Sequence, residues 1–133
     1  MNATAIDHVN LKIPDDGKDA ALDFYCDGLG FDADDLGVYE SGEKPFFSIR
    51  LSPGSVLHLW PDADFEAPTG TNYDHVAIRL DESIAEVKAT LDDAGIEILD
   101  EFEPLGATGT GPAVYVEGPF GYRVELKVES TET

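Results

Sequence analysis

Four residues of metal-ligating type, His8, His58, His75 and Glu125, are related by one repeated interval. The tripeptide Asp7-His8-Val9 returns as Asp74-His75-Val76, and His58 is separated from Glu125 by the same interval (75 − 8 and 125 − 58 both equal 67). A repeated interval of this kind indicates repeated structural units. The sequence therefore predicts two copies of one unit, and each copy contributes two residues of ligand type.

Each of these four residues lies in a short segment that alternates between aliphatic and polar side chains. Alternation is typical of a strand with one buried face, because successive side chains point to opposite faces. In every segment the histidine or glutamate lies opposite the aliphatic face; the segments are about 5–13, 55–61, 74–80 and 122–128. If these strands belong to one curved sheet, the four side chains point into one concavity.

Three imidazoles and one carboxylate suit a divalent transition metal such as Zn, Ni, Co, Mn or Fe. The neutral imidazoles bind without adding charge, and the carboxylate offsets part of the charge of the cation. A single histidine in a strand is more often a surface or hydrogen-bonded residue than a ligand, and a single glutamate is usually solvated. The shared interval and the shared face favour a metal site over four unrelated residues.

Basic residues are scarce, and five of the eight fall on the predicted ligand face by the same alternation. These five are Lys12, Arg50, Arg79, Arg123 and Lys127. Their placement suggests an anionic or oxyanion-forming substrate beside the metal. Side chains near strand ends can equally pair with surface acids, and the sequence weighs the two interpretations about evenly. Trp60 and Tyr115 lie on the same face, either as pocket lining or as packing aromatics.

The remaining segments complete a β-α-β-β-β order that occurs twice. Helical spacing predicts one helix that ends at Gly28 and Gly30, and a second that opens with a capping box of Ser83 and Glu86 and ends at Gly95. Further strands are expected within 31–40, 46–51, 96–103 and 113–117, and a mobile loop over 104–112. The order predicts an α+β domain with one module at about 5–61, a linker at about 62–73 and a second module at about 74–128.

The composition is strongly acidic, with 28 Asp and Glu against 8 Lys and Arg, and a formal net charge of −20. The acids are spread along the chain, which indicates a salt-adapted, halophilic protein of the cytoplasm rather than an interaction protein with a clustered acidic tail. No basic stripe is available for nucleic acid, and no apolar run is long enough for a membrane span. The single cysteine, Cys26, is consistent with a reducing compartment.

Taken in order, these motifs resemble the vicinal oxygen chelate superfamily, which includes glyoxalase I, methylmalonyl-CoA epimerase, fosfomycin-modifying enzymes, extradiol dioxygenases and bleomycin-binding proteins. The resemblance covers nearly the whole chain and rests on both Asp-His-Val tripeptides, on 21–31, on the glycine-rich segment 106–112 and on the ending 118–126. It implies two βαβββ modules that form a cupped mixed sheet with helices on the outer face. It also implies a homodimer, in which neighbouring modules complete each other's pocket.

The resemblance implies metal-ligand roles for His8, His58, His75 and Glu125. In glyoxalase I and the epimerase the position of His58 usually holds Glu or Gln, so a second carboxylate that could act as a base is replaced here. The bleomycin-binding branch generally lacks the metal ligands, and the full set in this sequence argues against that branch.

The activity implied is that of a metal-dependent lyase or isomerase, similar to lactoylglutathione lyase, that acts on a small oxygen-chelating substrate through an enediolate-like intermediate. Glu125 is the expected proton carrier. The substrate pocket is expected to contain Arg50, Trp60, Arg79, Tyr115 and Arg123.

Two alternatives stay open for the same fold. His8, His75 and Glu125 alone make the two-histidine-one-carboxylate set of Fe(II) dioxygenases and Mn(II) fosfomycin transferases. A ligand-sequestering module without catalysis would also use this architecture, with an incidental metal.

Overall fold

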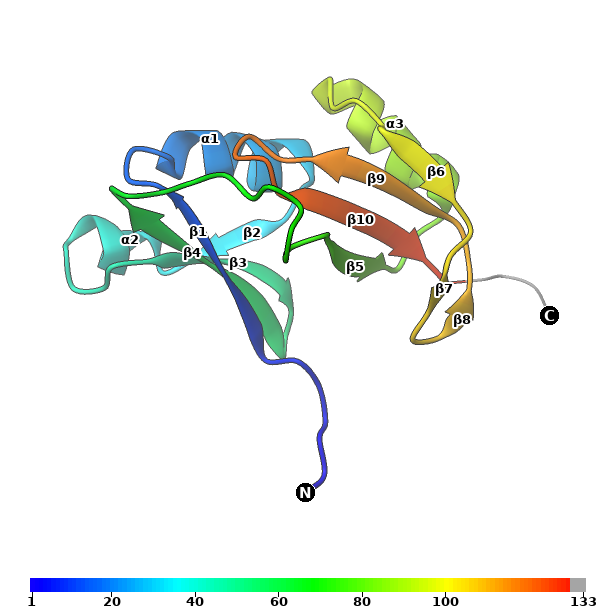
Figure 1. The fold of residues 1–133 in the computed structure, drawn as a ribbon, viewed down its shortest axis with the longest axis horizontal. Helices are drawn as coiled ribbons and strands as arrows, with labels where there is room; N and C mark the ends of the chain where they lie inside the picture. Colours follow the sequence, from blue (N-terminus) through cyan, green and yellow to red (C-terminus); the bar gives the residue numbers. More distant parts are fainter. Residues whose placement is uncertain (130–133) are drawn as a thin grey trace. The chain divides into compact units, whose positions relative to one another are not determined.

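The chain builds two similar units, each around a four-stranded mixed sheet. The computed structural model describes residues 1–129 and separates the chain into Met1–Glu66 and Ala67–Thr133. The strand order is β1-β4-β3-β2 in the first sheet and β5-β10-β9-β6 in the second (Figure 1). The predicted α+β class with a duplicated module is confirmed.

In the first unit, the two strands that carry His8 and His58 lie side by side and run parallel. β3 pairs antiparallel with both β4 and β2. The aliphatic faces are buried as predicted, since Leu57 and Leu59 on β4 are fully buried. The elements are β1 (His8–Pro14), α1 (Lys18–Leu22), the π-helix η1 (Asp23–Gly28), β2 (Asp32–Asp34), α2 (Leu36–Glu40), β3 (Phe47–Ser52) and β4 (Ser55–Asp62).

The second unit repeats the parallel pairing of its first and last strands, β5 and β10. Its helix, α3, begins at the predicted capping box of Ser83 and Glu86, and Gly95 ends it with a φ of 70°. Val87 and Leu91 are the buried residues of this helix, which contacts β10. The elements are β5 (Val76–Leu80), α3 (Ile84–Ala94), β6 (Asp100–Phe102), β7 (Leu105–Gly106), β8 (Gly109–Thr110), β9 (Ala113–Glu117) and β10 (Arg123–Val128).

The pairing registers of the two sheets repeat at the interval found in the sequence. His58 stands opposite Asn10 of β1, and Glu125 stands opposite Ala77 of β5, which is 67 residues after Asn10. On the antiparallel side, the partner of His58 is Ser48 and the partner of Glu125 is Tyr115. Each unit therefore presents equivalent positions around its predicted ligands.

Three predicted segments differ from the structure. Strand β2 ends at Asp34, because Asp35 adopts a left-handed backbone with φ 65° and residues 36–40 then form helix α2. The strand expected over 96–103 is reduced to Asp100–Phe102. The segment 104–112, expected to be a mobile loop, contains a short hairpin in which β7 pairs with β8.

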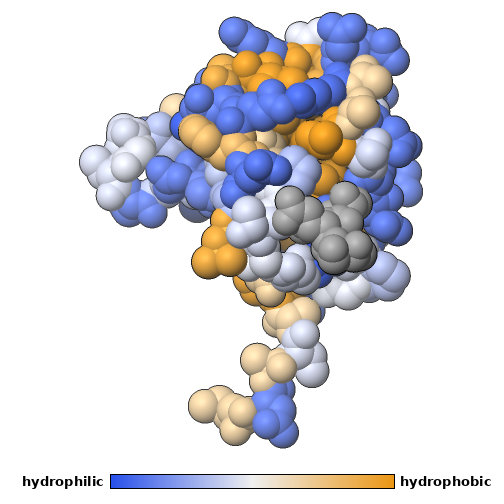
Figure 2. All heavy atoms as spheres, turned by 90° about the vertical axis from the view of Figure 1, so that its right-hand side faces the viewer, coloured by the Kyte–Doolittle hydropathy of each residue, from blue (hydrophilic) through white to orange (hydrophobic). Residues whose placement is uncertain are grey.

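The face seen in Figure 2 carries mainly polar residues, in keeping with the acidic composition. Figure 2 shows hydrophilic side chains interspersed with smaller hydrophobic areas on the face that carries β6, β7 and β8. Within the described residues, no helix is long and apolar enough to cross a membrane. The adaptation to salt inferred from the charge of −20 stays a prediction.

Candidate functional site

The first unit brings two of the four predicted ligands together. The ring centroids of His8 and His58 are 4.4 Å apart, with the ring planes inclined at 44°. This closeness follows from the register, since His58 stands opposite Asn10 and therefore diagonal to His8 on the neighbouring strand. Burial lowers the pKa of His58, and the adjacent His8 lowers it further, so the neutral imidazole that binds metals is favoured.

The second unit brings the other two together. His75 Nε2 lies 3.1 Å from Glu125 Oε1. The alternation along β10 placed Glu125 opposite the aliphatic face, and there only 4% of the residue is exposed. The Tyr115 hydroxyl donates to the same Oε1 at 2.5 Å. Burial, and then this hydrogen bond to Glu125, raise the pKa of Tyr115 to about 12, which keeps the hydroxyl a donor.

All three imidazoles have an oxygen partner at Nδ1. His8 Nδ1 lies 2.8 Å from Asp7 Oδ2, and His75 Nδ1 lies 2.5 Å from Asp74 Oδ2. His58 Nδ1 lies 2.8 Å from the hydroxyl oxygen of Ser48. Histidines that bind metals usually have this arrangement, because a partner at one ring nitrogen fixes the orientation of the other.

Each of the two pairs offers donor atoms of the kind that divalent transition metals bind. In the tautomer whose Nδ1–H donates to Asp74 Oδ2, the Nε2 atom of the neutral His75 ring carries a lone pair. That lone pair faces a carboxylate oxygen at 3.1 Å, an arrangement that a bound cation stabilises. The pairs His8–His58 and His75–Glu125 lie in different units, and within residues 1–129 no group of three or more His, Cys, Asp or Glu is gathered around one point.

Four of the five basic residues predicted on the ligand face pair with acids. The pairs are Lys12–Asp62 at 2.9 Å, Arg50–Asp34 at 2.7 Å, Arg79–Glu129 at 3.6 Å and Arg123–Asp100 at 2.8 Å. The fifth, Lys127, is only 5% exposed and donates to two backbone carbonyl groups. Pairing with surface acids thus accounts for most of these side chains, and Lys127 is the exception.

The predicted pocket aromatics lie next to the ligand-type residues of their own unit. Trp60 stacks on Phe46, with ring centroids 5.0 Å apart, and Phe46 in turn contacts the ring of His58 at 4.6 Å. In the second unit, the Arg123 guanidinium lies 4.7 Å from the centroid of the Tyr115 ring. Arg123 thus supports the tyrosine that binds Glu125.

A cavity of about 210 Å³ opens beside the pair in the second unit. It is lined by His75 and Glu125, by the strand residues Ala77, Arg79 and Lys127, and by the hairpin segment 105–108. Of the residues predicted for the site, this cavity gathers His75, Arg79 and Glu125. Because the carboxylate and the imidazole lie in its wall, the cavity is the place in this unit where a small substrate can meet them.

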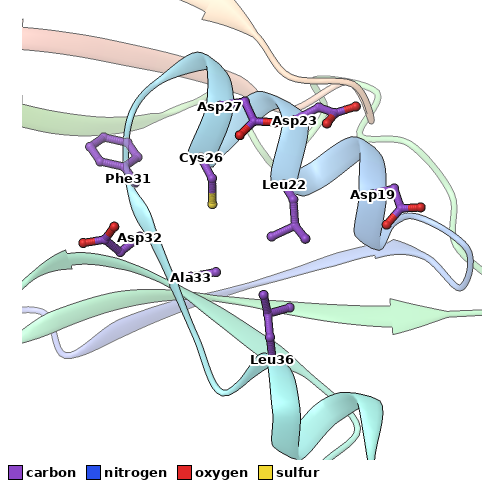
Figure 3. Close-up of a pocket in the computed structure, with 9 residues that line it drawn as sticks. All are labelled: Asp19, Leu22, Asp23, Cys26, Asp27, Phe31, Asp32, Ala33 and Leu36. Atoms are coloured by element: carbon purple, nitrogen blue, oxygen red, sulfur yellow. The ribbon is translucent and has the colours of Figure 1, made fainter.

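A larger cavity, of about 440 Å³, lies in the first unit between η1, β2 and α2. Figure 3 shows Leu22 and Cys26 projecting from the helical segment toward Ala33 and Leu36. Burial raises the pKa of the Cys26 thiol, and Asp27 and Asp32 raise it further. A thiol that keeps its proton is a poor nucleophile, so Cys26 is not an activated nucleophile in this cavity.

The sequence reasoning missed the partners that orient the ligands. Asp7 and Asp74 were visible as the residue before each repeated histidine, and the repeat could have identified them. Ser48 and Tyr115 are also 67 residues apart, but only the sheet register shows that they stand opposite His58 and Glu125. The burial of Lys127 under the hairpin had no signal in the alternating pattern.

Two similar units, in each of which the first and last strands pair in parallel and bring ligand-type residues together, define a duplicated α+β fold. The chain belongs to the Glyoxalase/Bleomycin resistance protein/Dioxygenase superfamily, whose sequence profile matches residues 5–126. This match confirms the resemblance. Members of the superfamily include enzymes and proteins without catalytic activity, and they generally use divalent metals.

Individual relatives agree with this assignment. A Synechocystis sp. protein named "Probable lactoylglutathione lyase" is 29% identical over 125 residues, which are 90% of this chain and 91% of that protein. A glyoxalase/dioxygenase from Nostoc punctiforme has a TM-score of 0.71 at 19% identity and covers 98% of this chain and 99% of its own. A glyoxalase family protein from Enterococcus faecalis gives 0.67 at 23% identity, with 92% and 96% covered. At these identities, the two structures establish the fold alone.

Proposed function

We propose that this protein is a metal-dependent lyase or isomerase of glyoxalase type, with His8, His58, His75 and Glu125 as ligands of one divalent cation. The distant relative named as a lactoylglutathione lyase supports the reaction class. The substrate is a small molecule with two adjacent oxygens. The protein acts as a homodimer in the cytoplasm.

The observation that carries the proposal is the repeated Asp–His pairing. Asp7 and Asp74 occupy Nδ1 of the two equivalent histidines, at 2.8 and 2.5 Å, and so turn Nε2 to another partner. Such carboxylate–histidine pairs are the usual support of a metal site, where their loss costs about 10- to 100-fold in affinity or activity. In the second unit the freed Nε2 already faces Glu125.

When bound, the cation would supply Lewis-acid stabilisation of negative charge on the substrate oxygens. Glu125 moves the proton, because its carboxylate lines the cavity beside His75. The Tyr115 hydroxyl holds Oε1 at 2.5 Å and leaves the second carboxylate oxygen, Oε2, for proton transfer. The low exposure of Glu125 excludes water from the carboxylate and strengthens its interactions.

The test begins with metal content and affinity. The purified protein is analysed for bound elements, stripped with a chelator and titrated with Ni²⁺, Zn²⁺, Mn²⁺ and Fe²⁺ by calorimetry. His75→Gln and Glu125→Gln should each weaken binding of the preferred metal by at least about 10-fold. Glu129→Gln makes the same chemical change at a carboxylate that is 63% exposed and should leave the affinity unchanged.

Catalysis is tested on the metal-loaded protein with the thiol adduct of a 2-oxoaldehyde and with a 2-substituted acyl thioester. Exchange of the substrate C–H proton with deuterated solvent, followed by NMR, should depend on Glu125. Oxygen consumption with an Fe²⁺-loaded protein and a catechol would instead support the dioxygenase alternative. Metal affinity that is equal in the His75→Gln variant and the wild type would overturn the proposed site.

A further inference from the structure

Lys127 carries a buried positive charge without a carboxylate partner. The residue is 5% exposed, and its Nζ donates to the carbonyl oxygens of Pro104 at 2.7 Å and Gly111 at 3.1 Å. Among residues 1–129, no Asp or Glu forms an ion pair with it, although the chain has 28 acids. Buried charges are normally paired, and the two carbonyls use two of the three N–H donors of an ammonium group.

Comparison of the two units shows that this charge is specific to the second. Lys12 of the first unit corresponds to Arg79 at the interval of 67 residues, and their ion pairs with Asp62 and Glu129 correspond too. The position equivalent to Lys127 is Trp60. The paired cation at the strand end is therefore common to both units, whereas the buried ammonium has no counterpart.

The sheet register places the two cations of the second unit directly opposite each other. Lys127 of β10 pairs in register with Arg79 of the parallel strand β5, so two positive charges stand on the same face of neighbouring strands. Both side chains line the 210 Å³ cavity that also contains His75 and Glu125. Two adjacent cations in one cavity are stabilised when an anion binds between them.

Of the two cations, Arg79 alone has an acidic partner within residues 1–129, and that ion pair is exposed. Glu125 already accepts from the Tyr115 hydroxyl and faces His75. Glu129 is 63% exposed and lies 3.6 Å from the Nε of Arg79, an exposed ion pair that contributes little and is readily exchanged for another anion.

We infer that the cavity of the second unit is an anion subsite, in which Arg79 and Lys127 bind the carboxylate- or phosphate-sized group of a small oxyanionic ligand. Ala77, opposite Glu125, has the small side chain that leaves room for the ligand. Lys127 lies two positions after Glu125 on the same face of β10, so the Cα atoms of the two residues are about 7 Å apart.

The hairpin forms one wall of this subsite. Lys127 donates to carbonyls on both sides of the hairpin, and a Cβ on Gly106 would come within 2.5 Å of the Lys127 Cε. The volume of 210 Å³ equals roughly seven water molecules at about 30 Å³ each, which suits a small acid or the charged end of a larger molecule. The role of this anion as part of the substrate rests on the proposed function, but its binding does not.

The test is a titration of the chelator-treated, full-length protein with inorganic phosphate at constant ionic strength, with chloride as the balancing salt. Binding is followed by ¹H–¹⁵N NMR on the backbone amides of Gly106, Ala107 and Thr108. We expect saturable shifts of these amides. Arg79→Gln should weaken the phosphate affinity by about 10-fold or more, and Lys127→Met should have an equal or larger effect.

The duplication supplies a matched control. Lys12→Gln removes the cation equivalent to Arg79 in the first unit and should leave the phosphate affinity within about twofold of wild type. Lys127→Met keeps most of the aliphatic stem, and its thermal unfolding is measured to show that it folds. If Lys127→Met does not fold, the phosphate affinity of Arg79→Gln alone tests the subsite. Absence of saturable shifts, or equal affinities in wild type and Arg79→Gln, would overturn the subsite.

Failure of the proposed function can be told apart from failure of the subsite. His75→Gln removes a proposed metal ligand but neither cation, so metal-free phosphate binding should persist in that variant. If phosphate binds while the metal-loaded protein transforms no substrate, the subsite stands and the proposed reaction falls. If neutral substrates turn over as fast as anionic ones and phosphate does not bind, the reaction stands and the subsite is refuted.

Discussion

The hydrogen bond between Tyr115 and Glu125 offers the sharpest test of how this fold holds its carboxylate. Glu125 is 4% exposed, and the Tyr115 hydroxyl donates to its Oε1 at 2.5 Å. Hydrogen bonds to charged groups contribute about 1.5–3 kcal/mol, against about 0.5–1.5 kcal/mol for neutral ones. Tyr115→Phe should therefore lower the free energy of unfolding of the metal-free protein by about 2 kcal/mol.

The chain provides a matched control in Tyr73, whose hydroxyl donates at 3.0 Å to the backbone carbonyl of Arg123. Tyr73→Phe removes the same atom from a neutral hydrogen bond and should cost about 1 kcal/mol. Both variants are measured by urea denaturation in the presence of a chelator. Both substitutions remove one hydroxyl group, so a larger loss of unfolding free energy in Tyr115→Phe than in Tyr73→Phe reports the charge of the acceptor.

A double-mutant cycle isolates the pair itself. Glu125→Gln keeps the volume and an oxygen acceptor but removes the charge, so the coupling with Tyr115→Phe should be about 1 kcal/mol, the difference between a charged and a neutral hydrogen bond. A loss in Tyr115→Phe no larger than in Tyr73→Phe, together with no measurable coupling, would refute the reasoning that this hydroxyl stabilises a buried carboxylate.

Three further predictions concern other parts of the chain. Gly106→Ala should lower the free energy of unfolding by about 1–2 kcal/mol, measured by urea denaturation, because the added Cβ displaces the tethered Lys127 stem. The hydrogen bond from Lys12 lowers the pKa of Asp62 below its usual 3.8. The loss of stability in Lys12→Met should therefore be present at pH 7 and should disappear once the pH falls below the lowered pKa of Asp62. Denaturation curves at pH 7 and pH 2 measure this difference. Cys26, whose thiol pKa is raised, should react with Ellman's reagent at pH 8 more slowly than glutathione does.

Each of these predictions has a contrasting outcome. Gly37→Ala adds a methyl group that meets nothing within 4 Å in helix α2 and should be neutral or stabilising, so an equal loss at Gly37 and Gly106 would contradict the contact with Lys127. A stability difference in Lys12→Met that is unchanged at pH 2 would exclude Asp62 as its origin. Labelling of Cys26 as fast as free glutathione would show an accessible, ionised thiol.

The alternating segments were predictable because burial of one face of a strand depends mainly on local sequence. Strand β4 illustrates this, with Leu57 and Leu59 buried as expected and His58 on the other face. Strand β10 does not show this alternation of buried and exposed faces. Glu125 is buried beside Tyr115, and Lys127 is buried beneath the hairpin. Contacts between segments distant in sequence decide the burial of such residues, and alternation carries no information about them.

The misassigned segments have local causes that propensity does not reveal. Residues 36–40 are helical because the backbone reverses at Asp35, a non-glycine residue with positive φ. The glycine-rich segment 104–112 forms a hairpin, and Lys127 ties its two ends together by donating to a carbonyl group at each. In both cases a single backbone or side-chain feature outweighed the average preference of the segment.

The sequence alone determined that the chain is a duplicated α+β protein, that its ligand-type residues recur at one interval, and which face of each strand they occupy, because repeats and period-two patterning are local properties. The tertiary structure decided which groups meet. It paired each imidazole with an oxygen at Nδ1, placed Tyr115 on Glu125, and gave four of the five basic residues an acidic partner while leaving Lys127 with carbonyl oxygens. Hydrogen bonds and ion pairs depend on positions within a few tenths of an ångström, and only the register between strands fixes those positions.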